Sequence, residues 1–347
     1  MTAAGVDALL LSVGADLPYF TGYVAMPLER LTMLVLPRDG DAILIVPALE
    51  APRVPDLGVC AMAPWGETED PIARVAAAVG NVGRLAVGDQ TWSRFTLALQ
   101  GALPTATWCP ANLVTAPLRM VKDAAEIAAL RAAAHAVDAV AAEMRDRPFA
   151  GRTEFDVHRE LVDRMLAHGH DVPNFAIVGS GPNGASPHHD ASSRVIAPGD
   201  VVVCDFGGTM AGYCSDITRM FSVGDPTAEV TDTYAALVEA QELAVQSAQV
   251  GVPCEAVDAV ARRSLATAGL ADAFIHRIGH GIGLEAHEDP YLVSGNPTPL
   301  VAGHAFSIEP GVYFPGRFGM RLEDIVVADA AGPDRLNQAR RDLAIVG

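Results

Sequence analysis

Five residues in the second half of the chain could bind metal ions, and each stands in apolar or glycine-rich surroundings. They are four carboxylates and one imidazole: Asp205, Asp216, His280, Glu309 and Glu323. A buried carboxylate is costly unless it is paired, and a divalent cation is one partner that can neutralise it. Carboxylates with one imidazole suit manganese, cobalt or zinc. Four acidic groups would over-neutralise a single dication, so the set favours two metal ions.

The segments that carry these residues are short apolar runs and glycine-rich stretches. Asp205 ends the apolar run Val201–Cys204, and Asp216 follows eleven residues later. We interpret Gly207–Gly212 as a turn, so we expect the two aspartates to face each other across a hairpin. One acid beside a strand is usually a surface or ion-paired residue, but five in such settings need a common reason.

The elements that must position these residues follow from periodicity and capping signals. In the first half, apolar runs and helical periods alternate, which predicts a small α/β domain. An Asp-Gly pair within Arg38–Asp41 separates two β-rich runs and predicts a hairpin. In the second half we expect helices that begin near Asp123 and after Thr153. Further helices are expected over 227–248 and 255–268, with strands over 175–178, 201–206 and 325–328.

Composition narrows the class of protein. A chain of 347 residues, half of them apolar and 19% charged, predicts about two folded domains. The net charge of −18 opposes binding to nucleic acid or to anionic membranes, and no apolar run approaches the ~20 residues of a membrane span. The N-terminus lacks the basic region of a signal peptide, and the five cysteines form no CxxC pair. We therefore expect a cytoplasmic protein with reduced thiols.

Two familiar strings are chance matches. Residues 179–184 spell G-x-G-x-x-G after a strand, but Pro182 and Pro187 crowd the place where a dinucleotide-binding helix would start. Asp205-Phe206-Gly207 spells the kinase DFG without a kinase catalytic loop elsewhere in the chain. Neither string predicts a nucleotide site.

The five candidate ligands, with their order and flanking residues, resemble the metal site of the pita-bread metallopeptidases. This superfamily contains methionine aminopeptidase, Xaa-Pro aminopeptidase, prolidase and creatinase, and the match spans residues 119–330. The first half resembles the creatinase-type N-terminal domain more weakly, through its pattern and the string Tyr19–Tyr23. The resemblance implies an α+β protein, with a smaller α/β domain over 1–118 and a pita-bread catalytic domain over 119–347.

The resemblance also implies a role for each ligand. Asp205 would chelate one metal, and His280 with Glu309 would bind the other. Asp216 and Glu323 would bridge the pair, and a water shared by the metals would be the nucleophile. Glu309 would also carry a proton from this water to the leaving nitrogen. The cofactor implied is a pair of divalent ions, Mn²⁺ first, with Co²⁺ or Zn²⁺ as alternatives.

Three histidines and one arginine match further family positions. His188 and His287 correspond to residues that stabilise the tetrahedral intermediate by hydrogen bonding. His276 corresponds to a substrate-side histidine of the prolidase branch. Arg321 corresponds to an arginine that either orients a carboxylate ligand or reaches the C-terminus of the substrate. We expect His189 to be structural or to support the site from outside the ligand set.

The function implied is hydrolysis of the bond between an N-terminal residue and proline in dipeptides or short peptides, by a homodimer. A methionine aminopeptidase would not need the front domain, and the creatinase-like branch has lost most metal ligands. Two alternatives stay open. One is an amidohydrolase acting on a small cyclic or N-acyl amide, and the other is a non-catalytic peptide-binding module on the same scaffold.

Overall fold

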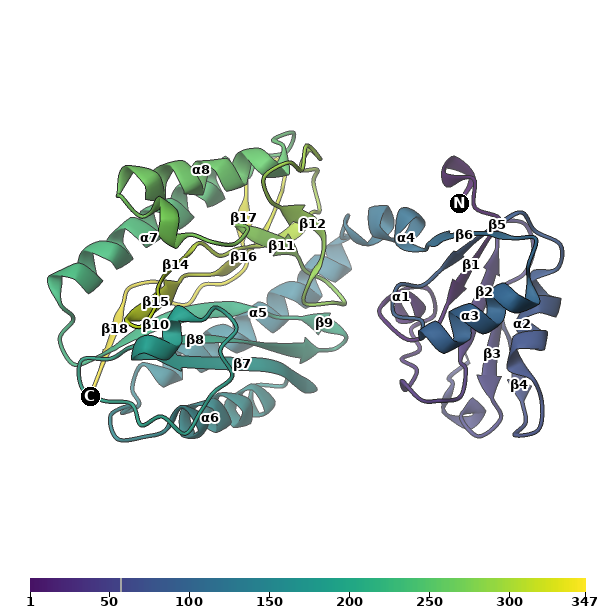
Figure 1. Ribbon diagram of the computed structural model, residues 1–347, viewed down its shortest axis with the longest axis horizontal. Coiled ribbons are helices and arrows are strands. Elements are labelled where there is room, and N and C mark those ends of the chain that lie inside the picture. Colours follow the sequence, from purple (N-terminus) through teal and green to yellow (C-terminus); the bar gives the residue numbers. More distant parts are fainter. Residues whose placement is uncertain (57) are drawn as a thin grey trace. The chain divides into compact units, whose positions relative to one another are not determined.

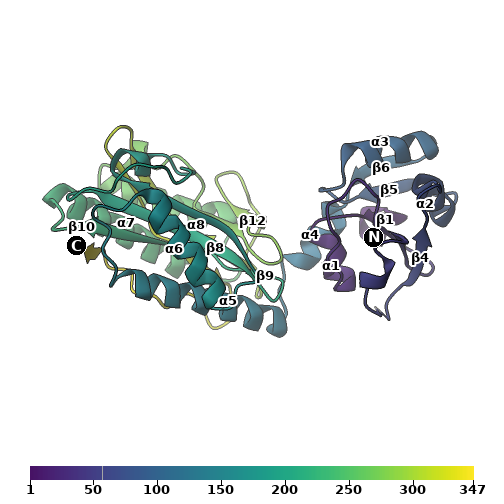
Figure 2. The ribbon, with the colours of Figure 1, turned by 90° about the horizontal axis from the view of Figure 1, so that it is seen from below.

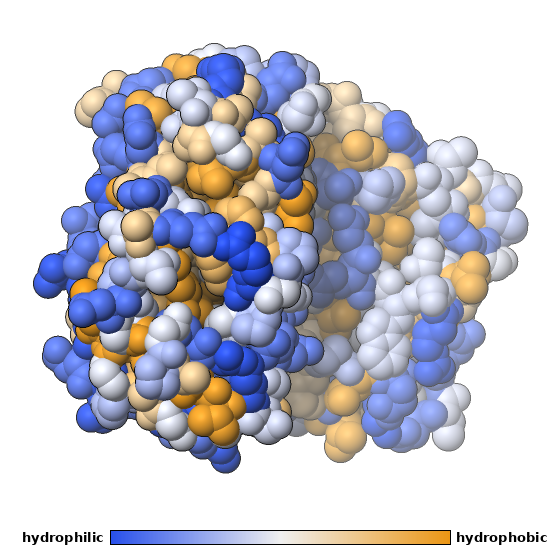
Figure 3. Space-filling view, turned by 60° about the vertical axis from the view of Figure 1, so that its left-hand side comes forward, coloured by the Kyte–Doolittle hydropathy of each residue, from blue (hydrophilic) through white to orange (hydrophobic). Residues whose placement is uncertain are grey.

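The chain folds into two compact units, Met1–Arg119 and Met120–Gly347, which are labelled by element in Figure 1. The structure is a computed structural model, and it describes residues 1–56 and 58–347. Within these residues, no helix has the length and apolar character needed to cross a membrane. On the face shown in Figure 3, hydrophilic and hydrophobic residues are interspersed.

A six-stranded sheet in the order β4-β3-β2-β1-β5-β6 forms the middle of the first unit. Its strands are β1 (Ala8–Leu11), β2 (Met33–Pro37), β3 (Ile43–Pro47), β4 (Ala61–Trp65), β5 (Arg84–Val87) and β6 (Thr107–Pro110). The strands β2 and β3 pair antiparallel on either side of Arg38–Asp41, which confirms the predicted hairpin.

Helices cover both faces of this sheet. They are α1 (Asp16–Thr21), α2 (Pro71–Val79), α3 (Ser93–Ala102) and α4 (Asn112–Arg119), with short 3₁₀ helices η1 (Thr2–Ala4) and η2 (Ala51–Arg53). Val75 of α2 and Leu99 of α3 pack in the core on one face, whereas Leu17 of α1 lies in the core on the other. The first unit is therefore the small α/β domain that the alternating pattern predicts.

The second unit contains two five-stranded sheets and a separate hairpin. The first sheet has the order β18-β10-β8-β7, with β9 paired to β8, and the second has the order β12-β11-β13-β16-β17. The strands of the first sheet are β7 (Val172–Ser180), β8 (Val201–Met210), β9 (Tyr213–Cys214), β10 (Ile217–Val223) and β18 (Ala344–Val346). The second sheet contains β11 (Gly279–Gly281), β12 (Glu288–Leu292), β13 (Ala305–Ile308), β16 (Asp324–Val327) and β17 (Asp334–Arg335). The hairpin pairs β14 (Gly311–Phe314) with β15 (Phe318–Arg321).

Two pairs of helices pack on these sheets. They are α5 (Ala124–Met144) with α6 (Glu154–Ala167), and α7 (Ala228–Ser247) with α8 (Cys254–Thr267). Two 3₁₀ helices, η3 (Gly181–Ala185) and η4 (Ala271–Ala273), lie in connections between other elements. Val137 of α5 and Leu161 of α6 share a core with Phe206 of β8, and Figure 2 shows both helices lying across that sheet. Leu237 of α7 and Leu265 of α8 share another core with residues of the second sheet and the hairpin. These layers confirm the α+β organisation that we expected for the second half.

The helix starts follow the predicted capping signals. The Asp123 side chain accepts hydrogen bonds from the first turn of α5, and Thr153 with Asp156 forms a capping box at the start of α6. The segment 179–184 enters η3, a 3₁₀ helix, so its glycines open no α-helix.

The structure has the expected hairpin, formed by β8 and β9, but the predicted extent of its turn, Gly207–Gly212, is wrong. Strand β8 continues to Met210, and the turn consists of Ala211 and Gly212, which have positive φ angles of 48° and 86°. A Cβ at Gly207 would lie 2.1 Å from the Ser215 carbonyl oxygen. The glycines of this strand therefore permit close approach of neighbouring backbone and do not mark a turn.

Candidate active site

The five predicted ligands lie together in the second unit, and each lies in a strand or directly next to one in the sequence. Asp205, Asp216 and Glu323 each offer an oxygen, and these three atoms lie within 4.8 Å of one another. One ligand atom from each of His280, Glu309 and Glu323 forms a second group of the same size. The structure thus brings all five residues to one place, with Glu323 common to both groups.

Strand pairing explains how residues so far apart in the sequence meet. Asp205 of β8 is the register partner of Thr218 of β10, and Thr218 forms an isolated bridge with Glu323, which precedes β16. The Thr218 hydroxyl also donates a hydrogen bond of 2.8 Å to Glu323 Oε2. Thr218 therefore connects candidate ligands of the two sheets, a role that its place in the sequence did not indicate.

The carboxylates of this site have the burial and the unpartnered oxygens expected of cation ligands. Asp205 Oδ1 and Asp216 Oδ1 are buried and accept no hydrogen bond from the described residues. Burial raises the pKa of Asp205, which Arg321 opposes in part. Burial and the neighbouring carboxylates raise the pKa values of Asp216 and Glu323 well above their usual range. Since unpaired buried anions are costly, divalent cations would stabilise this arrangement.

Glu309 and His280 form the second side of the cluster. His280 Nε2 lies 3.2 Å from Glu309 Oε1 and 3.9 Å from Asp216 Oδ2. Burial favours the neutral form of Glu309, but the hydrogen bond and charge of His280, with His276 and Arg321, lower its pKa to about 2. Glu309 is therefore an anion at neutral pH and is able to accept a proton.

Ser307 forms hydrogen bonds with both residues of this pair. Its hydroxyl accepts a hydrogen bond of 3.1 Å from the backbone N–H of His280 and donates one of 3.1 Å to Glu309 Oε1. No spacing rule in the sequence pointed to this residue.

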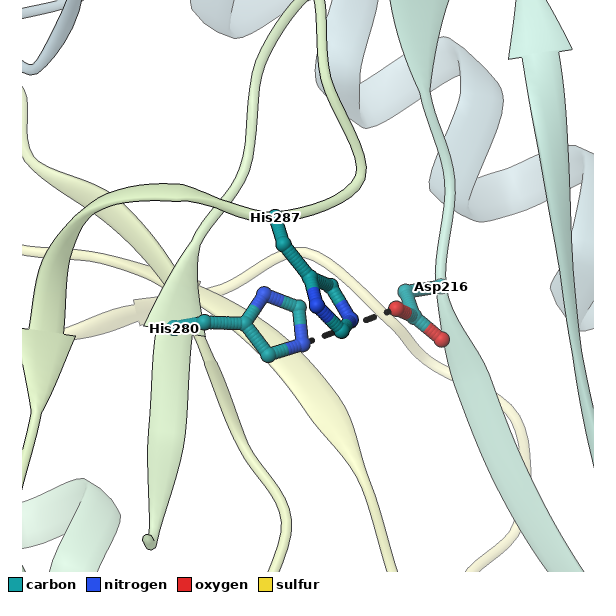
Figure 4. Close-up of side chains that lie close together, drawn as sticks. All are labelled: Asp216, His280 and His287. Atoms are coloured by element: carbon teal, nitrogen blue, oxygen red, sulfur yellow. Dashed lines mark ion pairs between the residues drawn. The ribbon is translucent and has the colours of Figure 1, made fainter. Parts of the chain in front are cut away.

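His287 and His188 border the carboxylate cluster. The rings of His280 and His287 have centroids 3.9 Å apart, and Figure 4 shows the His280 ring pointing toward Asp216 beside His287. Burial and the neighbouring His280 lower the pKa of His287 to about 4, although part of the side chain is open to solvent. His188 is exposed in the loop after η3, close enough for its charge to contribute to this lowered pKa. Two imidazoles are thus available at the edge of the cluster, and that of His287 is neutral at neutral pH.

His276 and Arg321 are connected through Tyr313. The Tyr313 hydroxyl lies 2.9 Å from His276 Nε2 and accepts a hydrogen bond of 2.9 Å from Arg321 Nη1. Arg321 is 3% exposed, and its Nη2 donates to Asp205. This geometry matches the first of the two roles considered for Arg321, in which it orients a carboxylate ligand.

Tyr313 is the main site residue that sequence reasoning missed. It stands four residues after Glu309 in a run of apolar residues, where a tyrosine usually indicates strand packing. Its contacts join β14 to His276, which lies between η4 and β11, and to Arg321 of β15. A search for polar groups in apolar runs would have found it, but would also have found Tyr234, which lies in the core of the second unit.

Comparison with known proteins identifies the family. Residues 128–330 match metallopeptidase family M24, and residues 1–121 match the creatinase/prolidase N-terminal domain. The chain belongs to metallopeptidase family M24.

Relatives in this family match the chain along nearly its whole length. It is similar to a probable dipeptidase PepE of Mycobacterium tuberculosis, with 44% identity over 99% of this chain and 93% of the relative. It is also similar to an Xaa-Pro dipeptidase of Lactobacillus helveticus, with 30% identity over 98% of this chain and 95% of the relative.

Solved structures give the same result for the fold. Dipeptidase PepE from Mycobacterium ulcerans is 46% identical, with a TM-score of 0.93 over 99% of this chain and 94% of that chain. A prolidase from Thermococcus sibiricus is 37% identical, with a TM-score of 0.92 over 99% of this chain and 95% of that chain. The chain is therefore an M24 peptidase of the Xaa-Pro dipeptidase type, in which a creatinase-type domain precedes a pita-bread catalytic domain in the sequence. The expected family and fold are confirmed.

Proposed function

We propose that this protein is a dinuclear-metal dipeptidase that hydrolyses the bond between an N-terminal residue and proline. One observation carries the proposal, namely the convergence of three buried carboxylates, the partly buried Glu309 and His280, in which Asp205 Oδ1 and Asp216 Oδ1 lack protein partners in the described chain. Divalent cations would stabilise a site of this composition by neutralising its carboxylates. A metal site also agrees with membership of a metallopeptidase family.

In this proposal the residues that hold the cations are those that the resemblance implied: Asp205, Asp216, His280, Glu309 and Glu323. When bound, two divalent cations would lower the pKa of a water and polarise the scissile carbonyl. Mn²⁺ is our first choice, and Co²⁺ or Zn²⁺ are the alternatives. Arg321 supports the site by holding Asp205 in place.

The groups around the cations would perform the proton transfers and stabilise charge. Glu309, an anion at neutral pH, would take a proton from the attacking water and give it to the proline nitrogen that leaves. The imidazoles of His188 and His287 would donate hydrogen bonds to the oxygen that becomes negative in the transition state. His276, held by Tyr313, would contact the substrate.

We further propose that the protein acts as a homodimer in the cytoplasm. The resemblance of its first unit to creatinase-type domains supports the dimer, and the reduced thiols that we expect support the compartment. Light scattering during size-exclusion chromatography measures the oligomeric state, and a monomer at assay concentration would contradict the first part.

A panel of substrates tests the proposed specificity. Metal-loaded protein is assayed with Ala-Pro, Gly-Pro, Ala-Ala, Met-Ala and an Ala-Pro-Ala tripeptide, and we expect the two dipeptides ending in proline to be cleaved fastest. Comparable rates for Ala-Pro and Ala-Ala would replace the proposal with a general dipeptidase. Cleavage of small cyclic or N-acyl amides, without cleavage of any peptide, would favour the amidohydrolase alternative.

A further inference from the structure

Glu154 is a fully buried carboxylate outside the metal cluster. It follows the cap Thr153 in the first turn of α6, and its exposed fraction is 0%. Burial alone would favour its neutral form, but hydrogen bonds from Ser180, Ser192 and His189 lower its pKa to about 2. Glu154 is therefore a buried anion that is held by donors.

These donors all lie in one segment, 180–192, with a serine at each of its ends. Oε1 accepts hydrogen bonds from the backbone N–H and hydroxyl of Ser180, at 2.8 Å and 2.6 Å. Oε2 accepts from the backbone N–H and hydroxyl of Ser192, at 3.0 Å and 2.6 Å. Asn183 Nδ2 lies 3.1 Å from each oxygen, and His189 Nε2 lies 2.8 Å from Oε2. Because a carboxylate only accepts hydrogen bonds, His189 must donate here.

His188 lies in the segment 180–192, whose two ends are both hydrogen-bonded to Glu154. His188 is exposed and has no hydrogen-bond partner among the described residues, so its position depends on the backbone of its loop. The preceding carbonyl, of Pro187, accepts a hydrogen bond of 3.1 Å from Arg321 Nη1, which places this part of the loop beside the candidate site. A fully satisfied buried network of this kind rigidifies the backbone around it.

We propose that Glu154 is a positioning residue, which fixes the loop 180–192 so that the His188 imidazole is presented to the reacting carbonyl. The inference rests on the proposed function, because it needs His188 to act on the substrate. It also gives His189 a role: the histidine beside the catalytic one serves as a donor to Glu154.

The test uses Glu154→Gln, which keeps the size of the side chain but replaces an acceptor oxygen by an NH₂ group that faces donors. The loop should loosen, and a misplacement of about 1 Å can cost on the order of 10²-fold in rate. We expect kcat for Ala-Pro to fall at least about tenfold, with KM changed less, since His188 acts in the transition state. Asp156→Asn is the matched control: Asp156 lies in the same helix turn, and its carboxylate accepts hydrogen bonds from Thr153 and Arg159, not from the loop. This control should keep kcat near that of the wild type.

A double-mutant cycle separates positioning from general stability. If Glu154 acts through His188, Glu154→Gln should cost little further activity in a His188→Ala background. The same fold-loss in both backgrounds, or no loss in either, would overturn the inference while leaving the peptidase proposal intact.

Hydrogen–deuterium exchange provides a readout that does not depend on activity. In Glu154→Gln, the amides of 180–192 should exchange faster, while those of α7 and α8 should be unchanged. Unchanged exchange in the loop would overturn the inference even if activity fell. If wild-type protein cleaves no Xaa-Pro dipeptide, the proposed function fails, and exchange still decides whether Glu154 fixes the loop. Should Glu154→Gln not fold, Ser192→Ala removes one hydroxyl donor and gives a milder version of both tests.

Discussion

Glu309 combines two proposed roles, because the same carboxylate is a proposed metal ligand and the proposed proton carrier. Its low pKa comes from His280, His276 and Arg321, which stabilise the anion against burial. In the proposal, this proton would come from a water whose pKa the cations lower.

Glu309→Gln tests this assignment. Glutamine keeps one oxygen for a cation but cannot accept the proton, so kcat should fall by the ~10²–10⁴-fold typical of a lost general base. KM and the melting temperature should change less, because proton transfer belongs to the transition state. Asp39→Asn is the control, since Asp39 is an exposed turn residue of the first unit. Near wild-type kcat in folded, metal-loaded Glu309→Gln would show that Glu309 is not the proton carrier.

Asp216 gives a prediction about pH. In metal-free protein its pKa is raised by burial and by neighbouring carboxylates, so the folded state holds a proton that the unfolded state releases. Stability from this group is present at low pH and is lost as pH rises through the window above the ordinary aspartate value. Asp216→Asn removes this titration, and chelated Asp216→Asn should melt above chelated wild type at pH 8.

The advantage should shrink as pH approaches 4, and thermal melts between pH 4 and 8 measure it. Asp156→Asn should behave in the opposite way, because hydrogen bonds from Thr153 lower the pKa of Asp156. Its loss of stability should be largest at neutral pH and should disappear in acid. A pH-independent difference between Asp216→Asn and wild type would contradict the raised pKa.

At the scale of elements, the helices and the first hairpin could be predicted because local signals decide them. Asp123 and Thr153 cap their helices as the sequence indicates, whereas the end of β8 could not be read from its glycines. The reason is that the Ser215 carbonyl approaches Gly207 too closely to leave room for a side chain. This contact crosses the hairpin, so no local sequence pattern reveals it.

Gly207→Ala tests the explanation. A Cβ there would lie 2.1 Å from the Ser215 carbonyl oxygen and 2.9 Å from the Phe175 ring, so β9 must move and take Asp216 with it. We expect a clearly lower melting temperature and weaker Mn²⁺ binding by calorimetry. Gly101→Ala is the control, because Gly101 lies in α3 with open space around its Cβ position. Alanine there should stabilise the helix by about 0.5–1 kcal/mol. Equal effects of the two substitutions would contradict the close-approach explanation.

Across the whole molecule, most of the site was predicted from resemblance to a family and not from local sequence patterns. The ligand set came from resemblance to a family, and the fold then brought Asp205, Asp216 and Glu323 within 4.8 Å of one another. Thr218, Ser307, Tyr313 and Glu154 were not predicted, because each acts through contacts between segments far apart in the sequence. Residues of this kind become visible only when both sheets are in place.

In the proposed function, cleavage depends on divalent cations held by the carboxylate cluster. The most direct measurement follows the rate of Ala-Pro hydrolysis while Mn²⁺ is titrated into chelator-stripped protein, with bound metal counted by atomic spectroscopy. We predict no detectable hydrolysis without metal, and a rate that rises to a plateau at about two ions per chain. Asp216→Asn should reach a lower plateau or bind fewer ions. Full hydrolysis of Ala-Pro by rigorously metal-free protein would contradict the claim.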